Sequence, residues 1–138
     1  MYIVVVSDNH GLVKPLEKIK EIYHDAAAFI HCGDSELDQR RMPGWVSVQG
    51  NNDYYYDYPE YLVLDVDGVR TLVIHGQQFS RLSIVAGVVK KARENRCTLA
   101  CFGHTHVYQV EEKDGVLVVN PGSIRYNRDG SKPCFALV

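Results

Sequence analysis

Side chains able to bind metal ions follow five short apolar runs of this sequence. The five segments are residues 7–10 (Ser-Asp-Asn-His), 31–34 (His-Cys-Gly-Asp), 50–53 (Gly-Asn-Asn-Asp), 75–76 (His-Gly) and 103–106 (Gly-His-Thr-His). Imidazole nitrogens with carboxylate or amide oxygens form a donor set for divalent transition metals, and the chain has no C-x-x-C pair to offer thiolates instead. The chemistry that these residues indicate is therefore metal-assisted.

The elements in front of these segments explain how the side chains could meet. Strands are predicted over residues 2–6, 26–32, 45–49, 70–75 and 98–102, because each is a short, mainly apolar run. Loops at the carboxyl ends of strands are where open α/β sheets place their sites. If these strands are neighbours, all five loops meet at one rim, and the glycines let the backbone turn sharply beside a ligand.

Helices and hairpins are predicted for most of the remaining chain. One helix begins at Pro15, and a second runs from a Ser80 cap to about Asn95. The inward side chains of the second helix are predicted to be Leu82, Val85, Val89 and Ala92. Asp-Gly turns at 67–68 and 114–115 indicate two hairpins, and residues 134–138 a closing strand. Together these elements predict one α/β domain over residues 1–138 with mixed sheets.

The composition restricts the classes of function. The chain has 138 residues, of which 46% are hydrophobic, and its formal net charge is −2. That balance argues against a nucleic-acid-binding protein that works by bulk charge, and against a polybasic membrane anchor. No apolar run approaches the ~18 residues of a membrane span, and the cysteines are predicted to be buried thiols. We therefore expect a cytoplasmic protein without a membrane partner.

The order of the five segments resembles the pattern of the calcineurin-like metallophosphoesterase superfamily. The pattern is D-x-H, then G-D, then G-N-[HC]-[DE], then H, then G-H-x-H, and the chain follows it from residue 8 to residue 106. The small single-domain bacterial and archaeal phosphodiesterase branch is the most similar. This resemblance implies a four-layer α/β/β/α sandwich with two stacked mixed β-sheets.

The resemblance also implies a site for two divalent metal ions. The ligands of one ion would be Asp8, His10, Asp34 and His106, and those of the other Asp34, Asn51, His75 and His104. Asp34 would bridge the two ions. Such donors suit Mn, Fe, Co, Ni or Zn, and manganese is favoured by the resemblance alone.

The charge of this site would suit a phosphate ester. Two divalent ions bring a charge of +4, and the carboxylates of Asp8 and Asp34 with a bridging hydroxide bring −3. The site is then left with about +1, which attracts a phosphate anion to an acidic chain. Ions ~3.5–4 Å apart activate the hydroxide for in-line attack on phosphorus. We therefore expect hydrolysis of phosphodiesters through a hydroxide that bridges two metals, with Asp34 positioning it.

The residue after the ligand Asn51 departs from the family pattern. Many relatives have His there and some small phosphodiesterases have Cys, whereas this chain has Asn52. An amide can donate a hydrogen bond to a phosphoryl oxygen but cannot deliver a proton at neutral pH. Loss of a general acid typically costs ~10²–10⁴ in rate for a poor leaving group. We expect Asn52 to steady the phosphoryl oxygens, with diesters and aryl esters preferred over alkyl monoesters.

Three residues near these segments also have structural interpretations. His31 is interpreted as a core histidine, and His24 as a solvated residue near a helix end. Asp53 either orients the neighbouring loop as a hydrogen-bond acceptor or caps a turn.

Further groups have more than one interpretation. Residues 120–123 (Asn-Pro-Gly-Ser) resemble a loop that borders the family's site, where the Ser123 hydroxyl and Arg125 could meet a phosphate; an ordinary Pro-Gly turn is favoured. A tyrosine cluster could stack on an aryl or base group, form a subunit contact or simply pack at the surface: Tyr54, Tyr55, Tyr56 and Tyr58. The solvated face of one helix is predicted to hold Lys90, Lys91, Arg93 and Arg96.

Two rival functions stay open at this point. One is a phosphomonoesterase or nuclease on the same site, and the lack of a basic stripe argues against the nuclease. The other is a non-catalytic scaffold, since the eukaryotic retromer has a scaffold subunit with this fold; an intact ligand set favours catalysis. The expected partner is a small phosphate ester, nucleic acid is not expected, and a homodimer is left open.

Overall fold

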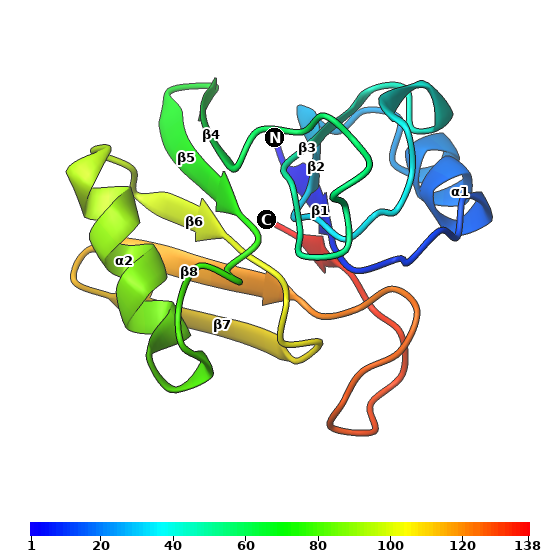
Figure 1. The fold of residues 1–138 in the computed structure, drawn as a ribbon. Helices are drawn as coiled ribbons and strands as arrows, with labels where there is room; N and C mark the ends of the chain where they lie inside the picture. Colours follow the sequence, from blue (N-terminus) through cyan, green and yellow to red (C-terminus); the bar gives the residue numbers. More distant parts are fainter.

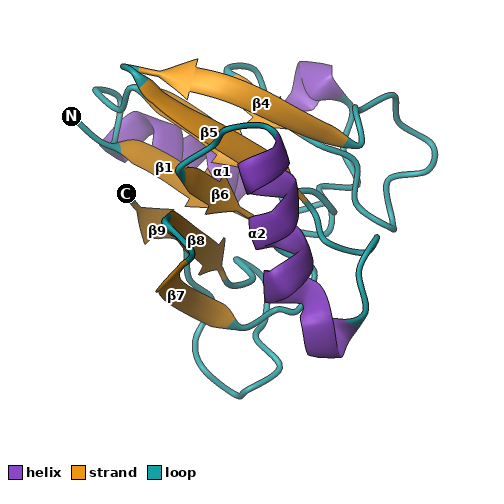
Figure 2. Cartoon of the chain, turned by 90° about the vertical axis from the view of Figure 1, so that its left-hand side faces the viewer, coloured by secondary structure: helices purple, strands orange, loops and turns teal.

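The computed structural model describes residues 1–138 and shows four layers. The elements are β1 (Ile3–Val6), α1 (Lys14–Ile22), β2 (Ala28–His31), η1 (Gln39–Arg41), β3 (Trp45–Ser47), β4 (Tyr61–Val66), β5 (Val69–Ile74), η2 (Arg81–Ser83), α2 (Ile84–Glu94), β6 (Leu99–Cys101), β7 (Tyr108–Lys113), β8 (Val116–Pro121) and β9 (Ala136–Leu137). One sheet has the order β3-β2-β1-β9 and the other β4-β5-β6-β8-β7. Helix α1 covers the first sheet and α2 the second, with α2 nearest the viewer in Figure 2 (Figures 1 and 2). The predicted α/β/β/α sandwich is confirmed.

Each of the three interfaces between layers has its own cluster of buried apolar side chains. On β1, Val4 and Val6 pack with Leu16 of α1, whereas Ile3 and Val5 belong to the cluster between the two sheets. Alternate side chains of the strand are therefore buried on opposite faces. This explains why β1 is a continuous apolar run rather than an alternating one.

Parallel pairing brings the strand ends together as predicted. Strand β1 pairs in parallel with β2 and β2 with β3, while in the other sheet β5 pairs in parallel with β6 and β6 with β8. Hydrogen bonds then join the loops that leave these ends. Within a sheet, Gly103 N donates to His75 O at 3.0 Å. Between the sheets, the backbone N–H of His104 donates to Asp8 Oδ2 at 3.2 Å.

The start of the second helix differs from the sequence prediction. Ser80 makes no side-chain cap; the 3₁₀ turn η2 intervenes, and α2 begins at Ile84. The prediction that Leu82 faces inward is wrong, because this residue lies on the 3₁₀ turn and is fully exposed. The buried side chains of α2 are Ile84, Val88, Val89 and Ala92.

Other structural expectations are confirmed. Strands β4 and β5 form one antiparallel hairpin and β7 and β8 the other, with turns at the two Asp-Gly pairs. All four cysteines are free, and three are buried: Cys32, Cys97 and Cys101. The chain contains no helix with the length and apolar character of a membrane span. The cytoplasmic location stays a prediction.

Candidate metal centre

The first group of ligand atoms surrounds the Asp8 carboxylate at the end of β1. His106 Nε2 lies 3.2 Å from Asp8 Oδ1, and His10 Nε2 lies 3.9 Å from the same oxygen. The two imidazole Nε2 atoms are 3.2 Å apart. One ligand atom from each residue lies within 4.8 Å of the others, which is close enough for a single ion.

The second group lies beside the first and shares Asp8 with it. His75 Nε2 is 3.4 Å from Asp34 Oδ2 and 3.9 Å from Asp8 Oδ1. Asn51 Oδ1 adds a further oxygen, 3.1 Å from His75 Nε2 and 3.1 Å from His104 Nδ1. The structure therefore gathers all the predicted ligand residues. Asp8 belongs to both compact groups and Asp34 to the second, so Asp34 as the bridge stays a prediction.

Outward hydrogen bonds fix which nitrogen of three histidines faces the site. Nδ1 of His75 donates to Cys32 O at 2.7 Å, and Nδ1 of His106 donates to Tyr126 O at 3.2 Å. Because a carbonyl oxygen only accepts, these Nδ1 atoms carry the proton. His10 is held in the same way by Glu36 Oε2 at 2.9 Å. In the neutral rings, the lone pair of each Nε2 therefore points inward, as in metal-ligating histidines.

The inward-facing atoms lack a positive partner, and a metal ion fits them. Asp8 Oδ1 is fully buried and accepts no hydrogen bond. Lone pairs of His10 and His106 face each other, and that of His75 faces two oxygens. Buried acceptors without donors are costly, and a divalent cation would satisfy this set of nitrogen and oxygen donors.

The pKa shifts follow from the same arrangement. Burial opposes ionisation of Asp34, but the hydrogen bond and charge that His75 offers when its imidazole is protonated, together with two Asn52 N–H groups, outweigh it and lower the pKa of Asp34. The carboxylate of Asp8 raises the pKa of His106 through their contact. Burial raises the pKa of Cys101 to about 12, so this thiol is not a competing thiolate ligand.

Asp53 orients two of the loops that carry ligands, which supports the first of its two interpretations. Its Oδ2 accepts the backbone N–H of Asp34 at 2.7 Å and that of Gly50 at 2.8 Å, and its Oδ1 accepts that of Glu36 at 2.8 Å. The carboxylate is fully buried. It therefore ties the loop after β2 to the loop after β3 without reaching the metal site itself.

His31 is a core histidine, as predicted. Its Nε2 pairs with Asn9 Oδ1 at 2.8 Å and its Nδ1 accepts the N–H of Gly33 at 3.0 Å. Because it is fully buried, its pKa falls to about 4 and the ring stays neutral. His24 is exposed beyond the end of α1, as predicted.

Glycine is required where two loops approach the carboxylates most closely. A Cβ on Gly50 would lie 2.1 Å from Asp34 Oδ1, and one on Gly103 would lie 2.1 Å from Ser7 Oγ. Real Cβ atoms do not approach other atoms so closely. These two glycines let the loops close around the site.

Asn52 is exposed, but it contacts Asp34, one of the predicted ligands. Its side-chain amide donates to Asp34 Oδ2 at 3.0 Å and its backbone N–H donates to Asp34 Oδ1 at 2.9 Å. The residue therefore holds the Asp34 carboxylate in place. Its predicted contact with phosphoryl oxygens stays a prediction.

The loop after β8 supports the site through its backbone and the Ser123 hydroxyl. The hydroxyl donates to Asp8 O at 2.9 Å and accepts the N–H groups of Arg125 and Tyr126. It is fully buried, so this serine organises the loop instead of meeting a phosphate. The Arg125 guanidinium lies on the surface and donates to His10 O at 3.2 Å.

The sequence interpretation missed Glu36 and Tyr126, although both contact ligand histidines. Glu36 holds His10 through Nδ1, and the Tyr126 ring packs against the His106 ring with centroids 4.8 Å apart. Glu36 follows Asp34 by two residues, which is the only signal that could have identified it.

The predicted tyrosine cluster divides into buried and exposed members. Tyr58 is buried and its hydroxyl donates to Leu37 O at 2.5 Å, so it belongs to the core. Tyr54 and Tyr55 are 68% and 82% exposed, with ring centroids 4.5 Å apart. Tyr56 is half-buried against the cluster beneath α1.

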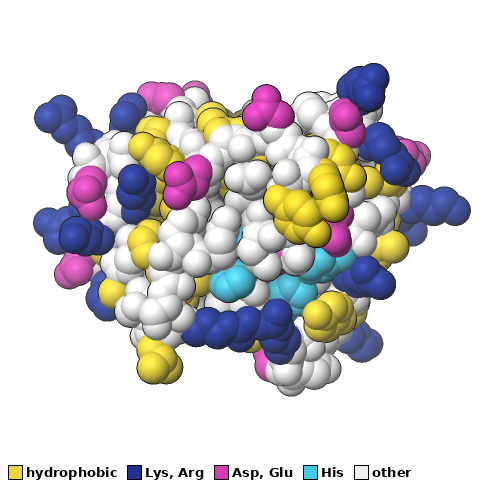
Figure 3. Space-filling model, viewed as in Figure 1, with side chains coloured by type: hydrophobic (Ala, Val, Ile, Leu, Met, Phe, Trp, Pro, Cys, Tyr) yellow, Lys and Arg dark blue, Asp and Glu magenta, His cyan; other side chains and the backbone are white.

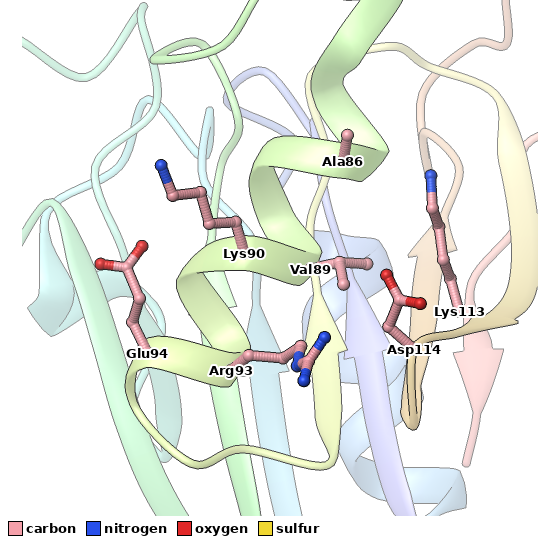
Figure 4. Close-up of a pocket in the computed structure, with 7 residues that line it drawn as sticks. All are labelled: Ala86, Val89, Lys90, Arg93, Glu94, Lys113 and Asp114. Atoms are coloured by element: carbon pink, nitrogen blue, oxygen red, sulfur yellow. The ribbon is translucent and has the colours of Figure 1, made fainter.

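The basic residues of α2 lie away from the metal site. A groove of about 420 Å³ has Lys90 and Arg93 on one side and the β7–β8 turn on the other (Figure 4). Glu94 and Asp114 also line it, so the groove has mixed charge. Lys90 and Arg93 are exposed to solvent, as predicted, and Lys91 lies over the Tyr61 ring at 4.2 Å.

Comparison with known proteins gives consistent matches over the full chain. The family model for the calcineurin-like phosphoesterase superfamily domain matches residues 1–138. The Probable metallophosphoesterase YsnB of Bacillus subtilis is 34% identical over 142 residues, covering 100% of this chain and 83% of that protein. A phosphodiesterase of Methanocaldococcus jannaschii is 28% identical, covering 88% of this chain and 83% of its own length. A Streptococcus pneumoniae protein of known structure, itself a predicted phosphoesterase, superposes with TM-score 0.91 at 33% identity and covers 99% of this chain and 81% of its own.

Proposed function

The chain belongs to the calcineurin-like phosphoesterase superfamily, and on this premise we propose that it hydrolyses phosphodiesters at a centre for two metal ions. Phosphoester hydrolysis is the activity of the family. The observation that carries the two-metal proposal is the donor set around Asp8: Oδ1 of this residue has no hydrogen-bond donor, and its carboxylate is shared by two compact groups of ligand atoms. One buried oxygen between two sets of inward lone pairs is an arrangement suited to two cations.

The proposed ligands are those expected from the sequence: Asp8, His10, Asp34, Asn51, His75, His104 and His106. The chemistry that two divalent ions supply when bound is a lowered pKa of a water molecule and neutralisation of charge on phosphoryl oxygens. Manganese is the proposed metal, with Fe, Co, Ni and Zn as alternatives that the same donors accept.

The residues of this chain would then position the reacting groups. Asp34 is held at both oxygens by Asn52, so that its carboxylate keeps one orientation toward the site. Asn52, at the position where many relatives have His, is an amide and cannot deliver a proton to a leaving oxygen at neutral pH. We infer a preference for diesters and aryl esters, whose leaving groups depart without protonation.

The proposed partner is a small phosphate ester. The net charge of −2 and the mixed charge of the groove on α2 speak against a polynucleotide substrate. The alternative use of the exposed Tyr54–Tyr55 pair is a contact between two copies of the chain.

The experiment combines metal analysis with a substrate panel. Purified protein is analysed for bound metals, stripped, reloaded with Mn²⁺, and assayed on bis-p-nitrophenyl phosphate, a cyclic nucleotide and alkyl monoesters. We expect about two ions per chain and hydrolysis of the aryl diester above that of the monoesters. His75→Ala removes one of the proposed ligands. We expect this variant to bind one ion fewer per chain, as measured by titration.

The control substitution is His24→Ala, since His24 is exposed outside the site. Two results would refute the proposal: a protein that binds no divalent ion, or a loaded protein that hydrolyses none of the panel.

A further inference from the structure

Large aromatic side chains remain exposed on two loops beside the metal site. Tyr126 is 51% exposed, and the Tyr54–Tyr55 pair is exposed to a greater extent. Figure 3 shows hydrophobic side chains, a class that includes tyrosine, next to the histidine side chains both above and below them. Aromatic rings on a protein surface near a reactive site offer a place for a flat apolar group to stack.

The Tyr126 ring is held in a fixed position relative to the first group of ligands. It packs against the His106 ring at an interplanar angle of 61°. The backbone of Tyr126 accepts the His106 Nδ1 proton through its carbonyl and donates its N–H to Ser123 Oγ. Because Ser123 is in turn bonded to Asp8 O, the backbone of Tyr126 is tied to the loop that carries Asp8, and the ring is placed against His106.

The Tyr54–Tyr55 pair lies on the loop that also carries Asn51 of the second group of ligands. Tyr54 follows Asn52 by two residues, so the Cα atoms of these two residues lie at most about 7 Å apart. Asp53 between them is anchored to the N–H groups of Asp34 and Gly50. An exposed aromatic side chain therefore contacts the first group at His106, and a pair of them lies on a loop of the second group.

We propose that these two tyrosine surfaces bind the base of a nucleoside phosphodiester while its phosphate lies at the metal centre. The proposal rests on the proposed phosphodiesterase function and adds the substrate class. Stacking on tyrosine accepts every base, because each base presents a π-face. The Arg125 guanidinium, which uses one N–H on His10 O, lies at the same rim and complements the negative charge of such a substrate.

The test compares two diesters that share a leaving group. Thymidine 5′-p-nitrophenyl phosphate carries a base, and methyl p-nitrophenyl phosphate does not. In the Mn²⁺-loaded wild type, we expect a higher kcat/KM for the thymidine ester. Tyr126→Ala and the double variant Tyr54→Ala/Tyr55→Ala should each lower the ratio of the two kcat/KM values by about tenfold, the usual effect of losing a stacked base.

Binding gives a readout that does not need turnover. Isothermal titration of thymidine 5′-phosphate and of methyl phosphate should show the same loss of preference in the tyrosine variants. Tyr126→Phe keeps the ring and should keep the preference. Val69→Ala is the control, because Val69 begins β5 at the end opposite His75 and should leave both esters unaffected.

Each result decides for or against the proposal. Equal kcat/KM for the two esters in the wild type, or an unchanged ratio in both tyrosine variants, overturns it. If the double variant changes only the molecular mass in solution, the pair is a contact between copies and the proposal is wrong. If neither ester is hydrolysed and the titrations still show the preference, the base-binding proposal stands and the proposed catalysis fails.

Discussion

Replacing Asp53 by Asn tests whether the metal site depends on a residue that does not touch the metal. The carboxylate accepts three backbone N–H groups at 2.7–2.8 Å in a fully buried position. An asparagine has the same size but only one acceptor oxygen. If the amide oxygen keeps the two bonds made by Oδ2, the amide NH₂ group faces the backbone N–H of Glu36. That N–H then has no acceptor.

The expected loss of stability follows from these bonds. A hydrogen bond to a charged group contributes roughly 1.5–3 kcal/mol, and bonds to a neutral acceptor are about half as strong. Loss of one bond and weakening of two gives about 3–6 kcal/mol, which lowers the unfolding midpoint of a chain of this size by roughly 10–20 °C. The loops that hold Asp34 and Asn51 also relax, and a change of this kind lowers metal affinity by about 10–100-fold.

The assay has two parts, thermal unfolding of the metal-free protein and titration with Mn²⁺. Asp57→Asn is the matched control, since Asp57 is exposed in the same loop and the substitution removes the same charge. A midpoint and an Mn²⁺ affinity of Asp53→Asn that equal those of the control would show that the three bonds do not hold the site together.

Four further substitutions give three separate tests. Asn52→His introduces a group able to deliver a proton, and we expect the ratio of activity on alkyl monoesters to activity on aryl diesters to rise by at least ~10²-fold; an unchanged ratio would contradict the role given to residue 52. Gly50→Ala places a methyl group 2.1 Å from Asp34 Oδ1, so we expect loss of metal binding, measured by titration, and a midpoint lowered by several degrees; full Mn²⁺ affinity would disprove the close approach. On the 3₁₀ turn η2, Leu82→Ala should change the free energy of unfolding by less than about 0.5 kcal/mol, whereas Val88→Ala on α2 should cost roughly 1–3 kcal/mol, both measured by urea unfolding; the opposite order would mean that Leu82 faces the core.

The sequence predicts the fold because inner strands such as β1 and β6 are apolar runs that the sandwich buries on both faces. The prediction fails at Leu82. The α-helical spacing of apolar residues in the sequence includes Leu82, but this residue lies on a 3₁₀ turn and its side chain is exposed to solvent. A pattern of apolar residues does not reveal this change of geometry, because the turn depends on how the loop after His75 packs.

The sequence also predicts that residues able to bind metal gather at one rim, because their positions at strand ends are local, and the family resemblance adds the ligand set. The partners of these ligands come from distant loops. Asn52 bonds to Asp34, and Tyr126 O to His106, only because separate loops close on one another. No local pattern in the sequence encodes these contacts. The contacts that hold the ligands in place are therefore the part that only the structure supplies.

Backbone strain and lone-pair repulsion are concentrated at the same residues. Asp8, His10, Asp34, His104 and His106 all have positive φ, between 44° and 70°, a region that is unfavourable for residues with a Cβ. Such positions persist where the surroundings over-determine them, and they are typical of functional sites. Here the surroundings are the outward bonds of the histidines and the Asp53 carboxylate. The fold is therefore destabilised by nitrogen and oxygen lone pairs that have no partner around one buried oxygen. Bound cations would offset this cost, and a purely structural role would not require it.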